Sequence, residues 1–138
     1  MPFQEISRIT GSAMAAETVR LNTIASNLAN AQAASGTEEG TYRARKPVFA
    51  TLMDTGLYGH GGGAVQVLDV VQSSEPLRKV YEPDHPLANA DGMVFYPNVN
   101  SVAEMTDMMS ASRAFETNVE VLGRVKAMQQ AILRLGEG

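Results

Sequence analysis

The residues best suited to chemistry in this sequence lie in a glycine-rich stretch that runs from His60 to Gly63. Glycine amides in such a run can hold the oxyanion that develops during acyl transfer. That reaction also needs a nucleophile, and no Gly-x-Ser-x-Gly segment occurs among the 138 residues. We therefore interpret Gly59 to Gly63 as a turn or mobile loop and His60 as a solvated loop residue.

Phosphate and metal binding are also poorly supported. The glycine-rich stretch lacks the lysine and the serine or threonine with which a P-loop reaches phosphates and magnesium. Asp84, His85 and Asp91 could be considered as metal ligands, but their spacing matches no zinc or calcium site. We interpret their segment as turns fixed by proline, and we predict no catalytic residue, metal or cofactor.

Length and composition predict one modest structural unit. The 138 residues are 44% hydrophobic but only 6% aromatic, without tryptophan, so the core should be mostly aliphatic. Eleven basic and fifteen acidic residues give a net charge of -4, and no basic run is present, so nucleic acid is not expected as a partner. Cysteine is absent, which excludes disulfides and thiolate metal sites.

No segment predicts membrane insertion or cleavage by a signal peptidase. No stretch reaches the roughly 18 apolar residues of a membrane span. The N-terminus lacks a basic region followed by an apolar one, as a secretory signal requires. By this test alone the chain would be cytoplasmic.

Apolar and small residues recur at helical spacing from Phe3 to about Ala31. The stretch is rich in alanine and has no proline after Pro2, so a continuous helix is expected. It would be roughly 42 Å long at 1.5 Å per residue, far longer than a small core needs. The recurring positions are Phe3, Ile6, Ile9, Ala13, Ala16, Leu21, Ile24, Ala25, Leu28 and Ala31.

A stronger helical pattern runs from about Val99 to Leu135. Asn100 or Ser101 is placed to cap this helix, and Glu104 is placed for a capping box. Two apolar stripes run along this helix. Because a surface helix in a monomer needs only one apolar stripe, we predict that it has more than one packing partner. The first stripe is Val102, Met105, Met109, Ser112, Phe115, Val119 and Leu122, and the second is Val121, Val125, Met128, Ile132 and Leu135.

The middle of the chain has no helical periodicity and reads as short strands between turns. The predicted fold class is α+β, with long terminal helices forming an antiparallel, coiled-coil-like shaft and a small β-rich insertion between them. Residues 1–35 and 99–138 are the helical parts, and residues 36–98 are the insertion with its glycine-rich loop, all in one structural unit. Strands are expected near Tyr42 to Met53, Ala64 to Val71, Arg78 to Tyr81 and Met93 to Phe95.

Asparagine is a mediocre helix former, yet Asn22, Asn27 and Asn30 stand beside the apolar stripe of the N-terminal helix. We interpret them as polar interface positions that fix register, with helix capping as an alternative for Asn30. The methionines of the C-terminal helix are expected to fill an aliphatic core rather than to form a docking surface. They are Met105, Met108, Met109 and Met128.

Flagellar rod, hook and hook-associated axial proteins carry a signature on their N-terminal helix that resembles LNTIASNLANAQA, from Leu21 to Ala33. The patch that follows this helix in the family is similar to YRARKPVF, from Tyr42 to Phe49. The proximal rod proteins of the bacterial flagellar basal body are similar throughout to the segment from Val80 to Leu122. The resemblance covers essentially the whole chain. It departs from the family at Asn89, where an acidic residue is usual, and at Met93, where an aromatic is common.

The resemblance implies a non-enzymatic structural subunit of the proximal rod. Such subunits polymerise through their terminal helices into a periplasmic shaft that links the MS ring to the distal rod and hook and transmits torque. They are exported by the flagellar type III apparatus without a cleaved signal peptide. The implied partners are other copies of the chain, other proximal rod proteins, the rod-base adaptor and the MS ring, with no nucleic acid and no small-molecule substrate. The alternative is a helical adaptor or binding module of a related secretion or surface apparatus.

Carried over position by position, the family's subunit interface falls on both terminal helices. A carboxylate in such an apolar seam is costly unless it finds a partner, so Leu28→Asp should block incorporation. The β-rich insertion is expected to lie outward of the helical layer, because its polar loops cannot occupy a dry interface. The interface positions are Leu21, Asn22, Ala25, Asn27, Leu28, Asn30, Glu104, Met105, Ser112, Arg113, Phe115 and Asn118.

Overall fold

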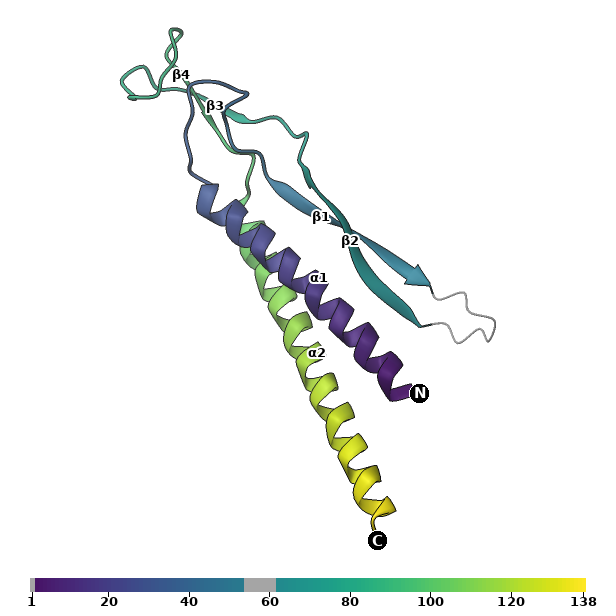
Figure 1. Ribbon diagram of the computed structural model, residues 1–138. Coiled ribbons are helices and arrows are strands. Elements are labelled where there is room, and N and C mark those ends of the chain that lie inside the picture. Colours follow the sequence, from purple (N-terminus) through teal and green to yellow (C-terminus); the bar gives the residue numbers. More distant parts are fainter. Residues whose placement is uncertain (1, 54–61) are drawn as a thin grey trace.

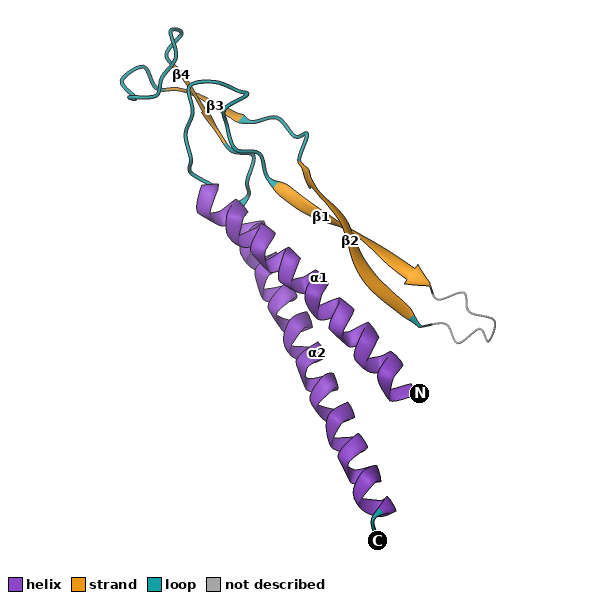
Figure 2. Cartoon of the chain, viewed as in Figure 1, coloured by secondary structure: helices purple, strands orange, loops and turns teal. Residues whose placement is uncertain are grey.

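The computed structural model describes residues 2–53 and 62–138, which form two long helices and two small sheets (Figure 2). The predicted α+β class, with long terminal helices around a β-rich insertion, is confirmed. The elements in chain order are α1 (Pro2–Asn30), β1 (Arg45–Met53), β2 (Gly63–Gln72), β3 (Arg78–Tyr81), β4 (Met93–Tyr96) and α2 (Ser101–Gly136).

Helix α1 ends one residue before the predicted boundary and begins one residue earlier, at Pro2. Proline is tolerated as the first residue of a helix, where its missing N–H would have no helical acceptor. The Ser12 hydroxyl donates to the Ile9 carbonyl at 2.7 Å and accepts a hydrogen bond from the backbone amide of Val65 in β2 at 3.0 Å. Ser12 therefore ties the middle of α1 to β2.

Helix α2 is capped by Asn100, one of the two predicted caps. The Asn100 side chain accepts a hydrogen bond from the backbone amide of Ala103 at 3.2 Å. With Asn100 as the cap, Glu104 lies one residue beyond the position that a capping box requires. Glu104 still lies in the first turn, where a negative charge favours the positive end of the helix dipole.

Helices α1 and α2 lie antiparallel and side by side, and the β1–β2 hairpin packs along α1 (Figure 1). Within residues 2–53 and 62–138, no strand packs against α2. Helix α1 is therefore the central element, with α2 and the hairpin as its two partners. Helix α2 has 36 residues against 29 in α1, and its C-terminal end extends past the start of α1 (Figure 1).

The hairpin starts where Arg45 pairs with Gln72, and its register shifts between Val48 and Phe49. Such a bulge increases the local twist of a two-stranded ribbon. The prediction that the first strand begins at Tyr42 is wrong by three residues. Tyr42 instead contacts α1, as described below. Gly63, expected in a loop, is the first residue of β2.

The second sheet pairs β3 with β4, and the loop after α1 adds a bridge to it. The Ser35 amide donates to the Phe95 carbonyl at 2.9 Å, and the Phe95 amide donates to the Ser35 carbonyl at 2.8 Å. Val94, the residue before Phe95, pairs with Val80 of β3 and is fully buried. This sheet forms a knob at the end of the molecule where α1 finishes and α2 starts (Figure 1).

The turn before β4 depends on Asn89 and Gly92. The Asn89 side-chain oxygen accepts hydrogen bonds from the amides of Asp91 at 3.0 Å and Met93 at 2.9 Å. Gly92 has φ 73°, and a Cβ there would lie 2.8 Å from the Tyr81 ring, so glycine is required. An aspartate oxygen can accept the same two amides. The asparagine therefore preserves the turn despite the departure from the family's usual acidic residue.

The buried interior is thin, which agrees with the scarcity of aromatics. The accessible surface is 9431 Å², whereas a compact monomer of this size exposes about 7,000 Å². The molecule is therefore elongated and leaves much of its helical surface uncovered. The buried apolar residues are Ala16, Ile24, Ala31, Ala44, Ala64, Val94, Ala111 and Val125.

A candidate subunit interface on the terminal helices

In the described chain, buried side chains of α2 and the ion pair between Arg20 and Asp107 join the two helices. Ala111 is fully buried and Val125 is 7% exposed. The Arg20 guanidinium donates to the Asp107 carboxylate across the helix pair and also lies 3.4 Å from Glu17. The hydrogen bond that Arg20 donates to Asp107 raises the pKa of Arg20 above its ordinary value. The pair links the second turn of α2 to α1.

Asn27 connects α1 to the start of the hairpin. Its side chain is 1% exposed, its Nδ2 donates to the Arg45 carbonyl at 2.8 Å, and its Oδ1 accepts from the Arg45 amide at 2.9 Å. The same oxygen accepts from the Tyr42 hydroxyl at 2.8 Å, and that hydroxyl lies 3.1 Å from the Ser26 hydroxyl. The polar groups of Asn27, which is buried, and of its partly buried partners are thereby satisfied within one chain.

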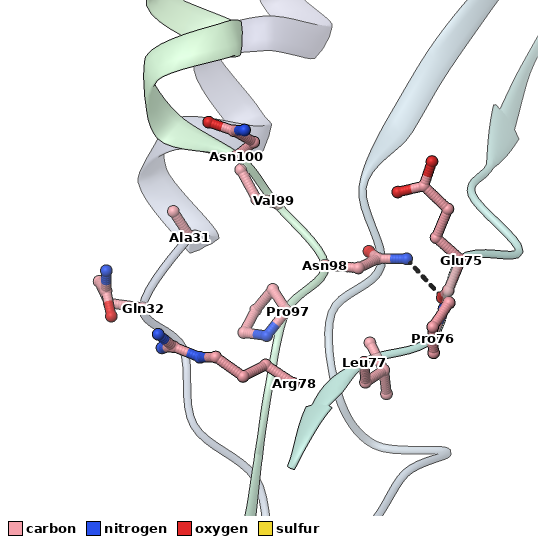
Figure 3. Close-up of a pocket in the computed structure, with 10 residues that line it drawn as sticks. All are labelled: Ala31, Gln32, Glu75, Pro76, Leu77, Arg78, Pro97, Asn98, Val99 and Asn100. Carbon is pink, nitrogen blue, oxygen red and sulfur yellow. Dashed lines mark hydrogen bonds between the residues drawn. The ribbon is translucent and has the colours of Figure 1, made fainter. Parts of the chain in front are cut away.

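A second junction lies where α1 ends and α2 begins. The side chain of Asn98 accepts a hydrogen bond from the Ala44 amide at 2.7 Å and donates to the Glu75 carbonyl at 2.9 Å (Figure 3). A hollow of about 310 Å³ adjoins it, and the side chain of Arg78 extends across this hollow towards Gln32 (Figure 3). The lining includes no pair of nucleophile and base, so the hollow reads as a joint between segments rather than a reaction site.

The N-terminal half of α2 turns an apolar stripe to solvent. Val102 is 74% exposed, Met105 is 56% exposed and Met109 is 59% exposed. The expectation that the helix methionines fill the core is therefore wrong for Met105 and Met109, and also for Met128, which is 54% exposed. They point outward because the small residues of α2, such as Ala111, face α1, where bulky side chains would separate the helices.

The C-terminal end of α2 is uncovered as well. Residues 130–138 are all exposed, since they lie beyond the start of α1. The large apolar side chains here are Ile132, Leu133 and Leu135. A lone helical end with this composition gains nothing from folding in water and is typical of a surface that another chain covers.

A groove of about 460 Å³ lies between β1 and the start of α2. Buried residues of α1 form its floor, with Ile24 at 2% exposure. Arg45 and Lys46 stand on the strand side, and Glu104 and Asp107 stand on the helix side. The groove exists because the hairpin and α2 pack on different faces of α1 and not on each other.

The structure places the predicted interface residues on α1 and α2 with three degrees of exposure. Asn27 is buried inside the subunit. Asn30 and Asn118 each donate to a backbone carbonyl one turn earlier, at 2.9 Å, and Asn30 does not adopt the left-handed conformation of an asparagine cap. The exposed residues are Asn22, Ala25, Met105 and Arg113, and the half-buried ones are Leu21, Leu28, Asn30, Glu104, Ser112, Phe115 and Asn118.

Sequence reasoning missed two kinds of residue. The first kind is polar residues that join segments: Tyr42 in the cluster around Asn27, and Asn98 at the second junction. Both residues lie in segments that resemble the family, and this resemblance was the sequence signal that could have pointed to them. On α2, the large exposed apolar residues outside the predicted set belong to the two stripes recognised by periodicity, except Leu133, which belongs to neither. The stripe members are Val102, Met109, Val119, Val121, Met128, Ile132 and Leu135.

The residues considered for chemistry do not gather into a site. His60 and Gly61 lie outside the described residues. His85 accepts a hydrogen bond from the Leu87 amide at 3.0 Å, as part of a series of turns that includes Asp84. In the part of the chain that the structure describes, no group of three histidine, aspartate or glutamate residues could hold a metal ion, and no helix is long and apolar enough to cross a membrane.

Two family profiles match the two helical ends of the chain. Residues 8–34 match the family described as flagella basal body rod protein. Residues 90–135 match the C-terminal family of flagellar basal body rod FlgEFG proteins. Both ends therefore match the class of flagellar basal-body rod proteins.

Full-length relatives narrow this class. The chain is 45% identical over 137 residues to the flagellar basal-body rod protein FlgC of Salmonella typhimurium, with 99% of this chain and 100% of the relative covered. It is 46% identical to FlgC of Escherichia coli O157:H7 with the same coverage. FlgC of Bacillus subtilis is 33% identical over 94% of this chain and 95% of its own length. The chain belongs to the FlgC family of flagellar basal-body rod proteins.

Proposed function

We propose that this chain, a structural subunit of the flagellar basal-body rod, polymerises through α1 and α2 into the proximal rod. In this role it forms part of the periplasmic shaft that links the MS ring to the distal rod and hook and transmits torque. The observation that carries the proposal is the uncovered apolar surface of α2, above all Val102, Met105 and Met109. Neighbouring helices bury such a surface, and the resulting packing carries load without a catalytic step.

The partners and the route follow from the same role. The chain reaches the growing tip through the flagellar type III export apparatus, without a cleaved signal peptide. Its neighbours are further copies, the other proximal rod proteins, the rod-base adaptor and the MS ring. The β-rich insertion lies outward of the helical layer, since in the described chain the hairpin packs on α1 and not on α2, and polar loops cannot occupy a dry interface.

The decisive experiment introduces a charge into the exposed stripe without disturbing the fold. Met109→Asp should abolish swimming and prevent incorporation into isolated hook–basal bodies, because burying an unpaired carboxylate opposes assembly. Ser110→Asp, at an exposed neighbouring position outside the stripe, is the matched control and should swim normally. Leu28→Asp should also block incorporation, but Leu28 is half-buried within the chain, so Met109 gives the cleaner result.

Circular dichroism of both purified variants checks that their helices are intact. Normal motility of Met109→Asp would contradict the interface. Complete basal bodies in a strain that lacks the gene would favour a helical adaptor or binding module of another apparatus.

A further inference from the structure

We propose that Met105 and Met109 form an oxidation-sensitive site, where a peroxide converts both thioethers into sulfoxides and so keeps the subunit from assembling. The effect on assembly rests on the proposed function, because the polarity of these side chains matters only if a neighbour covers them. The oxidation itself rests on their exposure and their chemistry. The co-reactant is a two-electron oxidant of the peroxide class, of which hydrogen peroxide is the simplest.

All sulfur in this chain is methionine sulfur. The sequence contains eight methionines and no cysteine, so no thiol within the chain competes for a peroxide. Access to solvent then decides which thioether reacts first. Among the residues that the structure describes, the exposed methionines are Met53, Met105, Met109 and Met128, and the half-buried ones are Met14, Met93 and Met108.

Position distinguishes Met105 and Met109 from the other exposed methionines. They lie four residues apart on one face of α2, beside Val102, and their side chains are 56% and 59% exposed. Two exposed sulfur atoms therefore lie about one helical turn apart within a single apolar stripe. Met53, although 79% exposed, is the last residue of β1 and lies outside the helices.

The reaction needs no catalytic group. A lone pair of the methionine sulfur attacks one peroxide oxygen, a sulfur–oxygen bond forms, and the oxygen–oxygen bond breaks. The sulfur loses two electrons to the peroxide. The departing hydroxide takes the proton of the transferred oxygen and leaves as water. The flexible apolar side chain becomes a polar sulfoxide.

A sulfoxide on the stripe opposes burial against an apolar neighbour. Its oxygen is hydrogen-bonded by water while the subunit is free, and it loses this partner when a dry interface closes over it. Val102 beside it has no side-chain donor to replace the water. We therefore expect incorporation of the oxidised subunit to fall about tenfold or more. Oxidised subunits would be excluded from the rod, and sulfoxide reductases would return them to use.

The first experiment measures the oxidation itself. The purified full-length chain is treated with hydrogen peroxide and digested, and fragment masses follow the gain of one oxygen at each methionine. Met105 and Met109 should react several-fold faster than the half-buried Met108, which lies in the same turn. Circular dichroism before digestion checks that the helices are intact. Equal rates at the three positions in a folded chain would overturn the proposal.

The second experiment measures assembly in strains that lack the natural gene and the sulfoxide reductases. They express the natural chain, the double variant Met105→Leu with Met109→Leu, or Met53→Leu as the control. Each chain is induced during a short exposure to hydrogen peroxide, and hook–basal bodies are counted with and without the exposure. The ratio of the two counts is compared, so an effect of leucine on basal assembly cancels.

Peroxide should lower the count about tenfold or more for the natural chain and for Met53→Leu, and little for the double variant, because leucine has similar volume and no sulfur. A double variant as sensitive as the natural chain would overturn the proposal. So would basal bodies in which the natural chain carries both sulfoxides as often as the free chain does.

Met109→Asp separates this failure from failure of the proposed function. If that variant cannot assemble while the chain with both sulfoxides can, the stripe is an interface and only its sensitivity to oxidation is wrong. If Met109→Asp swims normally, the interface itself is wrong.

Discussion

The side chain of Asn27 binds both backbone polar groups of Arg45, donating to its carbonyl at 2.8 Å and accepting from its amide at 2.9 Å. A helix residue thereby takes the place of a neighbouring strand at the first residue of β1. Few other side chains can do this, because the amide group carries a donor and an acceptor side by side.

Asn27→Ala should therefore destabilise the subunit. The substitution removes both hydrogen bonds between Asn27 and the backbone of Arg45, which are partly buried, and each such bond contributes about 0.5–1.5 kcal/mol. Urea denaturation measures the loss. Asn22→Ala is the control, since Asn22 is exposed on the same helix; its effect should stay within about 0.5 kcal/mol. Equal losses of stability in the two variants would contradict the role of Asn27 in holding the start of β1 against α1.

Ala111→Leu should force the helix pair apart. Ala111 is fully buried, and extra methylenes in such a site cost about 1–3 kcal/mol through strain and displacement of the backbone. Ala127→Leu introduces the same side chain at an exposed position of α2 and should change thermal stability little. A normal melting temperature for Ala111→Leu would mean that the helices are less closely packed than described.

Asn100→Ala should shorten or fray the start of α2. Loss of the hydrogen bond to the Ala103 amide removes a cap that contributes about 0.5–2 kcal/mol. Far-ultraviolet circular dichroism during thermal melting checks this. Ser101→Ala tests the other predicted cap and should have little effect, because Ser101 is already the first helical residue. A larger effect at Ser101 would reverse the choice of cap.

Asp107→Asn should weaken the helix pair by less than about 1 kcal/mol, because the ion pair with Arg20 is partly exposed to solvent. The hydrogen bond to Asp107 raises the pKa of Arg20 above its ordinary value. A raised folded-state pKa gives stabilisation that is complete below the unfolded pKa and is lost only as the pH rises through the folded value. Arg20 therefore adds no pH dependence between about pH 7 and 10.

The difference between wild type and Asp107→Asn should accordingly be the same at both ends of this pH range and should shrink at about 1 M salt. Guanidine is itself a salt, so urea is the appropriate denaturant. Glu120→Gln is the control, since its pair with Arg124 is largely exposed and should contribute still less. A difference that persists undiminished in high salt would indicate that Asp107 acts through packing.

The helices and strands could be predicted because local signals were strong and agreed with one another. Apolar spacing set the extent of α1 and α2 to within two residues, and proline and glycine separated the strands. The boundary at Tyr42 was wrong because Tyr42 lies against α1, where its hydroxyl donates to Asn27, and the paired strand begins only at Arg45. A hydrogen bond between side chains fifteen positions apart produces no periodic pattern in the sequence.

The candidate interface was harder to predict than the fold. Periodicity gives the stripes of a helix but not which stripe faces a partner within the chain. Met105 and Met109, which belong to the first stripe, face solvent, whereas the buried Ala111, which belongs to neither stripe, faces α1. The resemblance to the family also included Asn27, which the structure uses inside the subunit. Whether the remaining positions meet a neighbour stays a prediction.

The central position of α1 also has a mechanical consequence. A twisting force on the hairpin reaches α2 through α1 and through the joint at Asn98, because the hairpin and α2 do not pack together in the described chain. The hydrogen bond that the Val65 amide donates to Ser12 lies on this route near the middle of α1, and the one that Asn27 donates to Arg45 lies near its end. Sliding of the hairpin along α1 is thus resisted at two separated points. Two points also prevent the hairpin from rotating about either one.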